Sequence, residues 1–325
     1  MQQTIRSSAQ RNIIQPRLKK NRLSLKTIKS QKYLIFMSFP FLVWLLIFKY
    51  IPLWGWTMAF QQYMPGKSFF EQKWVGLKYF VSMFKDDLFY NAMRNTLAMS
   101  LLSLAFGFTL PIILAILINE IKGERFKKSV QTISYLPHFV SWVIVASIFN
   151  KLLTTDSGVV NNILVGLRII EEPVQFMAKP ELFWWIVTFA DIWKELGWNS
   201  IIFLAAISSI SPDLYESAMV DGASRFRRIW HITVPGILPT VMVILIMSIG
   251  NLINTGFERQ FLMRNSLVRD FSDVLDLYIL DYGVSAGRWA FGTAAGIFKS
   301  VVSIILVFLA NTFSRRTMGV GIVSK

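Results

Sequence analysis

Apolar blocks of about 20 residues recur along this chain, and they constrain its fold more than any other feature. The block at 95–119, for example, contains no charged side chain. About 20 helical residues are enough to cross the hydrocarbon core of a bilayer. Charged residues make up 16% of the chain, whereas a soluble domain carries about 25%. The sequence therefore predicts an all-α polytopic membrane protein.

Six membrane-spanning helices are predicted from these blocks. The first, at 33–56, follows a basic N-terminal tail at 1–32. An outer segment at 57–94 holds short amphipathic pieces that we expect to lie along the membrane interface. Residues 95–313 form a core of five further spans, and a C-terminal tail follows at 314–325. The expected core spans are 95–119, 129–150, 182–208, 236–257 and 290–313.

The distribution of basic residues predicts the orientation. Six spans place both termini on one side of the membrane. The loops on that same side are short and rich in Lys and Arg, which is typical of cytoplasmic loops. The tail 1–32 alone has nine Lys or Arg and no acidic residue. Nucleic-acid binding is the alternative explanation of the net charge of +15, but no aromatic residue interleaves with the charges before Tyr33. We expect both termini, and the segment 215–239, to be cytoplasmic.

Several kinds of chemistry are excluded by composition. The chain has no cysteine, which rules out disulfides, thiol catalysis and cysteine metal sites. Its two histidines, His138 and His231, are far apart, and no carboxylate spacing helps either of them hold a metal. A Gly-x-x-x-x-Gly-Lys-Ser/Thr phosphate loop is missing from the sequence. We therefore expect no metal, no bound cofactor and no ATP hydrolysis by this chain.

The cytoplasmic segment before the fifth span has the pattern of two short helices joined by a turn. Ser211 is placed to cap the first helix, with Pro212 in its first turn. Gly222 follows an aspartate and can adopt the positive φ that breaks a helix. A basic amphipathic helix then starts near Ser224, and Pro235 is expected to end it before the next span. Such a surface element can dock on a partner; the alternative is a plain connecting loop with an interfacial helix.

The residues of this segment resemble the EAA motif of the permease subunits of bacterial ABC importers. Two departures are small, since Ser217 stands where that family usually has Ala and Val234 where it often has Leu. The matching positions are Glu216, Ser217, Ala218, Asp221, Gly222, Ala223, Phe226, Ile232 and Pro235. Further stretches at 193–207, 254–258, 298–302 and 309–311 resemble the LplB-type branch, which serves polysaccharide-derived oligosaccharides. Within that branch the chain is similar to the first permease subunit of alginate importers.

This resemblance implies a type I importer (MetI-like) permease fold and a set of partners. In the family the motif forms the coupling helices, which insert into a cleft of the ATPase. The expected partners are a homologous second permease in a heterodimer, two ATPase subunits that bind ATP and Mg, a periplasmic or extracellular solute-binding protein, and membrane lipid. The expected substrate is an oligosaccharide, with acidic uronate chains such as alginate favoured over neutral chains.

Charged residues within the predicted spans are the first candidates for substrate contact, because a charge at mid-membrane is costly unless it is paired or faces water. Lys194 and Lys299 are the two basic candidates, and a uronate would require cations. Trp193, Trp198 and Asn199 lie near Lys194 and offer the aromatic faces and amide that sugars bind.

Two further candidates and one structural alternative remain open from sequence. Arg288 and Trp289, at the expected outer mouth, would touch either substrate or the binding protein. Alternatively, Lys194 pairs with Asp191 or Glu195 for structure alone, and Lys299 pairs with an acid on another span, such as one of these two.

Two other classes of function are less well supported. An ion-coupled secondary transporter would use carboxylates at mid-membrane, and the spans offer only Asp191 and Glu195. A membrane-embedded enzyme would need a cluster of acid, base or metal-binding groups at one face, and the sequence shows none.

Overall fold

The computed structural model describes residues 30–319 and 321, so the predicted tail 1–32 falls almost wholly outside the described residues. The chain divides after Gly55 into two compact units. The described part of the first unit is an apolar helix. It consists of α2 (Lys32–Leu45), a π-helical turn (η1, Leu46–Tyr50) and a 3-10 helix (η2, Ile51–Phe60) that continues past the boundary. Its mean hydropathy of 2.1 and length of 29 residues suit a membrane span, and none of its apolar window is buried within the chain.

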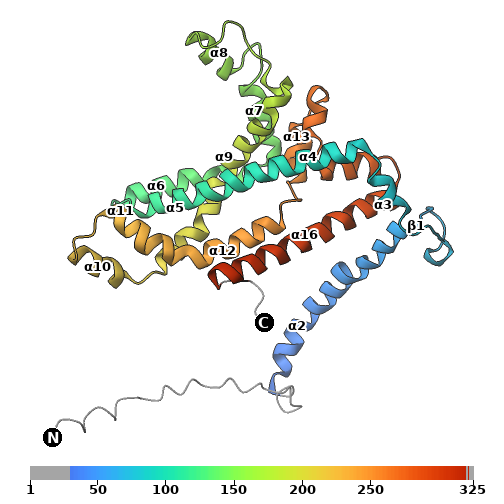
Figure 1. The fold of residues 1–325 in the computed structure, drawn as a ribbon, viewed down its shortest axis with the longest axis horizontal. Coiled ribbons are helices and arrows are strands. Elements are labelled where there is room, and N and C mark those ends of the chain that lie inside the picture. Colours follow the sequence, from blue (N-terminus) through green and yellow to red (C-terminus); the bar gives the residue numbers. More distant parts are fainter. Residues whose placement is uncertain (1–29, 320, 322–325) are drawn as a thin grey trace. The chain divides into compact units, whose positions relative to one another are not determined.

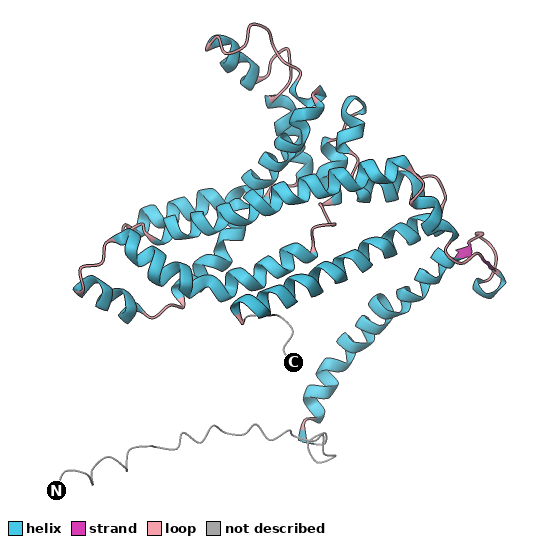
Figure 2. Ribbon diagram, viewed as in Figure 1, coloured by secondary structure: helices cyan, strands magenta, loops and turns pink. Residues whose placement is uncertain are grey.

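The second unit is built almost entirely of helices (Figures 1 and 2). It starts with a two-stranded antiparallel hairpin, in which Gln61 pairs with Trp74 and Gln62 with Lys73. The amide of Gln72 closes this hairpin through bonds to Met64 and Lys67. The hairpin consists of β1 (Gln61–Gln62), a 3-10 turn (η3, Phe69–Glu71) and β2 (Lys73–Trp74). The short helix α3 (Lys78–Met83) follows it.

The second predicted span is a 33-residue helix that starts eight residues before the expected position. It comprises α4 (Asp87–Leu102), a π-helical turn (η4, Ser103–Phe108) and α5 (Thr109–Asn119). The early start has a polar cause. Asp86 caps α4 by accepting a hydrogen bond from the Leu88 amide, and the buried Asn95 donates to two carbonyls, those of Asp270 and Asp273. These bonds satisfy polar groups in the first turns of α4, so the helix starts before the apolar block.

The third predicted span, 129–150, is not one straight helix. The structure has α6 (Glu124–Tyr135), a 3-10 turn (η5, Leu136–Phe139) and α7 (Trp142–Leu152), with a bend of 99° at the break. Pro137 removes a backbone donor at this point. Beyond the break, Ser141 caps α7 by accepting from the Ile144 amide. The predicted range 129–150 is therefore divided between two helices.

The 29-residue helix α9 (Pro180–Ser208) is the central element of the second unit. Its first half packs Phe183, Val187 and Ala190 into a core with α4, α7 and the later helices, and its second half packs against α5 and α12. Between α7 and α9 the chain forms α8 (Val159–Gly166) and a 3-10 turn (η6, Phe176–Ala178).

The segment after α9 forms the two expected short helices, but the second does not end at Pro235. The elements are α10 (Pro212–Val220), α11 (Arg225–Arg228), a π-helical turn (η7, Ile229–Thr233) and α12 (Val234–Gly250). Pro235 is the second residue of α12, just past the π-helical turn that interrupts the regular i→i−4 ladder, so its missing donor does not end the helix. One helix of 26 residues therefore runs from Arg225 to Gly250, and the predicted fifth span ends seven residues earlier than expected.

The chain from 251 to 288 forms short helices that are joined by ion pairs. Arg264 donates to Asp281 at 2.7 and 3.2 Å, and Arg269 donates to the same carboxylate at 3.0 Å. Burial acts to raise the pKa of Asp281, but these arginines outweigh it and hold that pKa below its usual range. The elements are α13 (Phe257–Met263), a 3-10 turn (η8, Ser266–Val268), α14 (Arg269–Ser272), α15 (Leu275–Tyr278) and a π-helical turn (η9, Ile279–Val284).

The last helix, α16 (Trp289–Met318), has 30 residues and ends at Gly319, whose φ of +70° is left-handed. The predicted span 290–313 lies within it. Among the described residues, four helices are long and apolar enough to cross a membrane, or five if the bent pair α6/α7 counts as one span. Helix α9 also has the length, but it holds Asp191, Lys194 and Glu195 within five positions.

The close crossing of α6 and α9 predicts the effect of a small substitution. A Cβ added at Gly197 would lie 2.0 Å from the Ser134 carbonyl oxygen, whereas one at Gly296, inside α16, would meet nothing within 4 Å. We expect Gly197→Ala to destabilise the protein by about 1–3 kcal/mol through overpacking. Gly296→Ala, the matched control, should be neutral or stabilising, because Ala favours a helix interior. Melting temperatures of the detergent-purified chain would measure both, and equal melting temperatures would contradict the close crossing.

The ion pair between Lys299 of α16 and Asp276 of α15 predicts a second effect. Both side chains are largely buried, so removing one partner leaves a poorly solvated charge. We expect Lys299→Met to destabilise the protein by about 3 kcal/mol, and the double change Lys299→Met with Asp276→Leu to recover most of this loss. Thermal unfolding of the three proteins is the measurement. A double variant no more stable than Lys299→Met would show that the pair is not the reason Lys299 is buried.

Candidate functional site

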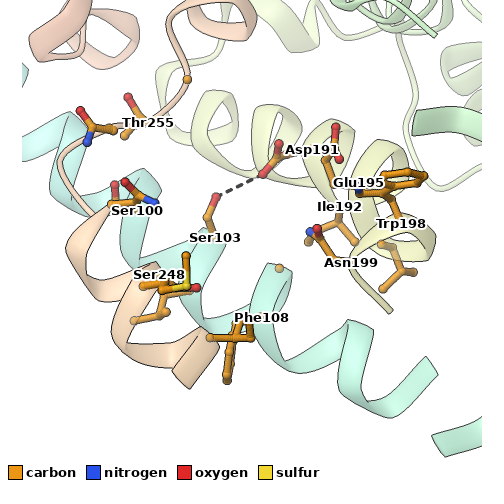
Figure 3. A pocket seen from close by; sticks show the side chains of 18 of the residues that line it. Ser100, Ser103, Phe108, Asp191, Ile192, Glu195, Trp198, Asn199, Ser248 and Thr255 are labelled. Carbon is orange, nitrogen blue, oxygen red and sulfur yellow. Dashed lines mark hydrogen bonds between the residues drawn. The ribbon is translucent and has the colours of Figure 1, made fainter. Parts of the chain in front are cut away.

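A cavity of about 620 Å³ lies within the second unit, between α4/η4, α9, α12 and the segment 251–259 (Figure 3). Apolar side chains such as Phe108 and Ile202 form much of its wall, but a set of polar residues interrupts them. These polar residues are Ser100, Ser103, Asp191, Glu195, Asn199, Ser248, Asn251, Asn254, Thr255 and Arg259. No group of three or more His, Asp or Glu among the described residues could hold a metal ion.

Local breaks in the helices bring these polar groups to the cavity. The π-helical turn η4 contributes Ser103 and Gly107, and such turns are often found at functional sites. Helix α12 ends at Gly250, so the irregular stretch that follows brings backbone and asparagine side chains to the wall. The hydroxyl of Ser100 donates to the Leu252 carbonyl and fixes this stretch against α4.

Asp191 and Arg259 form an ion pair in the cavity wall. The guanidinium Nη1 of Arg259 bonds to Oδ2 of Asp191, and Ser103 donates to the same oxygen at 3.4 Å (Figure 3). The Arg259 side chain is 9% exposed, so its charge is held almost entirely by this carboxylate. Its Nε has no hydrogen-bond partner among the described residues.

Glu195 forms a second neutralised group. Its Oε2 bonds to Nδ1 of His138 at 2.7 Å and its Oε1 pairs with Lys194 at 3.0 Å. Lys194 also donates to the His138 carbonyl at 2.6 Å, immediately before the break between α6 and α7. The His138 ring stacks on Trp198, with centroids 4.2 Å apart and planes 3° from parallel. The structure therefore confirms the pairing of Lys194 with Glu195. It also shows that Lys194 donates a hydrogen bond to a backbone carbonyl at the break between two helices.

Of the seven residues proposed from sequence for the substrate path, the cavity wall contains Trp198 and Asn199. Trp193 lies instead in a separate apolar pocket of about 480 Å³ formed by α7, α8 and α9. Lys194 is buried behind the wall.

The other three proposed residues lie on or near α16, away from the cavity wall. Arg288 is exposed, with its guanidinium 4.2 Å from the Phe291 ring centroid, and Trp289 is exposed beside it. Lys299 does pair with an acid on another element, but the partner is Asp276 and neither Asp191 nor Glu195. Asp276 lies between the predicted spans 236–257 and 290–313, so its approach to α16 was not foreseen.

Sequence reasoning missed most of the polar wall. Ser100 and Ser103 interrupt an apolar span, and hydroxyls inside a membrane helix are a usable sign of an inward-facing surface. Asn251, Asn254 and Arg259 carried no such sign, because they lie beyond the end of α12 where helical periodicity no longer applies.

The predicted partner-binding segment has the expected local geometry. Gly222 has φ +74°, as predicted, and the Ala223 amide donates to the Ala218 carbonyl at 2.8 Å to close the end of α10. Glu216, Ser217 and Asp221 are exposed. The most exposed apolar side chains of the segment are Val220, at 88%, and Phe226, at 77%.

Two contacts attach this segment to the helix bundle. The Tyr215 hydroxyl lies 2.9 Å from Oγ1 of the buried Thr233. Arg225 pairs with Glu120, at the end of α5, so α10 and α11 lie at the end of the bundle where α5 finishes (Figure 1). Ile232 is half-buried, and Pro235 is exposed on the helix that follows.

Comparison with known proteins gives a consistent set of relatives. Protein LplB of Bacillus subtilis (strain 168) is 43% identical over 289 residues, which cover 89% of this chain and 90% of that protein. The polygalacturonan/rhamnogalacturonan transport system permease protein YteP of the same organism is 42% identical over 298 residues, with 92% of each chain covered.

Two solved structures share the fold. One chain in the crystal structure of a bacterial ABC transporter involved in the import of the acidic polysaccharide alginate is 44% identical, with a TM-score of 0.82 over 90% of this chain and 98% of that one. A chain of the bacterial alginate ABC transporter in complex with an alginate pentasaccharide-bound periplasmic protein is 43% identical, with a TM-score of 0.84 over 91% and 99%. A family model for the inner membrane component of binding-protein-dependent transport systems matches residues 107–319. The chain therefore belongs to this family of membrane permease subunits of ABC importers, and it is not an enzyme.

Proposed function

We propose that this permease forms one half of a translocation path for oligosaccharides, and that the cavity at α9 is part of that path. The observation that carries the proposal is a cavity of about 620 Å³ in the helix bundle, whose largely apolar wall is interrupted by ten polar side chains. Sugars require hydrogen-bonding groups and an aromatic face, and the wall provides amides, hydroxyls and Trp198. The fixed charges of the wall are paired with each other or with neighbouring groups, so a neutral polar ligand meets no unpaired charge.

In this proposal the chain crosses the membrane six times, with both termini in the cytoplasm. The apolar helices listed above supply up to five spans, including the bent pair α6/α7, and α9 supplies the sixth. The charges of α9 are compatible with a span because each has a partner inside the bundle.

The segment 212–235 is proposed to couple this permease to an ATPase. Its docking surface would consist of Glu216, Ser217, Ala218, Asp221, Gly222, Ala223 and Phe226, with Ile232 and Pro235 on the helix behind. ATP and Mg would be bound by two ATPase subunits and not by this chain. The exposure of Val220 and Phe226 supports a partner here, since apolar side chains that are exposed together on a surface are typical of interaction sites.

The coupling proposal predicts the effect of a strained turn. Gly222→Val places a β-branched residue at φ +74°, which costs about 1–2 kcal/mol and displaces α10. We expect it to abolish substrate-stimulated ATP hydrolysis in the assembled complex, and Glu216→Ala to reduce it strongly. The matched control is Gly66→Val, at φ +91° and also in open space, but in the β1–β2 hairpin. Normal hydrolysis and transport by both test variants would refute coupling through α10.

Partners on the outer side and within the membrane complete the proposal. A homologous permease would form the heterodimer and the other half of the path, and lipid would surround the pair. A solute-binding protein would deliver the substrate from outside. The crystallised alginate transporter with its periplasmic protein supports this partner, and the exposed Arg288 and Trp289 are proposed as part of its docking surface.

The favoured substrate class is acidic uronate chains such as alginate, with neutral oligosaccharides as the alternative. The support comes from the relatives, whose names include alginate and polygalacturonan. An ion-coupled secondary transporter is less well supported by the geometry, because Asp191 and Glu195 are already paired with Arg259, Lys194 and His138.

A panel of oligosaccharides tests the substrate class. The complex, reconstituted in proteoliposomes with its binding protein, should hydrolyse ATP faster with oligouronates than with neutral oligosaccharides of equal length. Omitting the binding protein is the control, and it should remove the stimulation by every sugar. Stimulation by neutral chains alone would refute the uronate assignment while leaving the permease role intact.

A further inference from the structure

We infer that the cavity of this subunit recognises the hydroxyl groups of a sugar chain and does not discriminate for its carboxylates, with Arg259 acting as the positioning residue that neutralises Asp191. This inference rests on the proposed function, since it concerns the same cavity. It is also narrower, because it assigns any preference for acidic chains to groups outside this wall.

The first support is the state of the charges. Among the described residues, the wall contains three charged side chains, Asp191, Glu195 and Arg259. Arg259 is bonded to Asp191 and is itself 9% exposed. Glu195 is held by Lys194 and His138, which lie behind the wall. The one cation of the wall is therefore already paired with a carboxylate, and its Nε, which has no partner among the described residues, is buried.

The second support is the state of the neutral groups. Asn199, Asn251 and Asn254 all line the cavity and are exposed, and their side-chain amides make no hydrogen bond within the described residues. An amide offers both donors and an acceptor, and a hydroxyl offers both as well. A carboxylate accepts hydrogen bonds but donates none, so it would leave the amide oxygens unmatched. The free groups of the wall are thus complementary to sugar hydroxyls.

The energetic consequence follows from desolvation. A carboxylate that leaves water for this wall gains no charge partner, and burying a charge without one is unfavourable. A uronate chain can pass if its carboxylates stay hydrated or face the other permease, while its hydroxyls contact the asparagines. The wall then contributes similar binding to acidic and neutral chains.

The test compares uptake of two probes by the reconstituted complex, an oligouronate and its carboxyl methyl ester of the same length. The measured quantity is the ratio of the two initial rates in each variant relative to the wild type. The same binding protein is used throughout, so its own preference cancels. Arg259→Gln exposes an unpaired Asp191 and should lower the uronate-to-ester ratio about tenfold, while Asp191→Asn exposes an unpaired Arg259 and should raise it by a similar factor.

The double variant with Asp191→Asn and Arg259→Gln is decisive. If the two charges only cancel each other, the double variant keeps the wild-type ratio although both singles depart from it. If Arg259 instead binds the carboxylates, the double variant loses uronate uptake selectively, as Arg259→Gln does, and the inference is overturned. Co-purification of the ATPase and its basal hydrolysis would show that each variant is assembled.

A second variant keeps the inference testable if the charge variants fail to assemble. Asn251→Leu removes an exposed amide without touching the ion pairs, and it should lower the uptake of both probes by the same factor. A selective loss of the uronate would overturn the inference. If the wild-type complex transports neither probe, the proposed function is refuted, and the inference with it. If the wild-type complex transports both probes and Asn251→Leu has no effect on either, the inference alone is refuted.

Discussion

The arrangement of the second unit depends on three charges that α9 carries through the middle of the helix bundle. Asp191, Lys194 and Glu195 would each be costly in a bilayer without a partner. Each has one. Asp191 pairs with Arg259 of α13, and Glu195 pairs with Lys194 and with His138 from the turn after α6. Because a buried pair contributes little net stability but is expensive to break, these pairs fix which elements lie beside α9. The cavity forms where they leave a gap.

The bend between α6 and α7 is linked to the same charges. A helix that turns by 99° leaves backbone carbonyls without their usual donors. Lys194 donates to one of them, the His138 carbonyl, while its charge is matched by Glu195. From the sequence, Lys194 is a candidate either for substrate contact or for pairing with Asp191 or Glu195. In the structure Lys194 joins the broken helix to the charged helix, and it is buried behind the cavity wall.

Much of the fold could be predicted from periodicity and composition, and the errors have a common cause. The apolar helices and the turn at Gly222 depend on local properties that the sequence displays directly. The early start of α4, the continuation through Pro235 and the partner of Lys299 depend on contacts with the segment 251–288 or on π-helical turns, and no local pattern records these. The same holds for the site. Trp198 and Asn199 were found because they flank a charged residue in a span, whereas Asn251 and Arg259 reach the cavity only through tertiary packing.

The uninterrupted helix from Arg225 to Gly250 has a mechanical consequence. At 1.5 Å per residue its 26 residues form a rod about 39 Å long, with α10 attached at one end and Asn251 immediately beyond the other. Two points in this rod can absorb bending: the π-helical turn at Ile229–Thr233 and Pro239, which removes a backbone donor inside α12. A tilt imposed on α11 is therefore transmitted along the helix toward Asn251 and the cavity wall, reduced by the bending that these two points absorb.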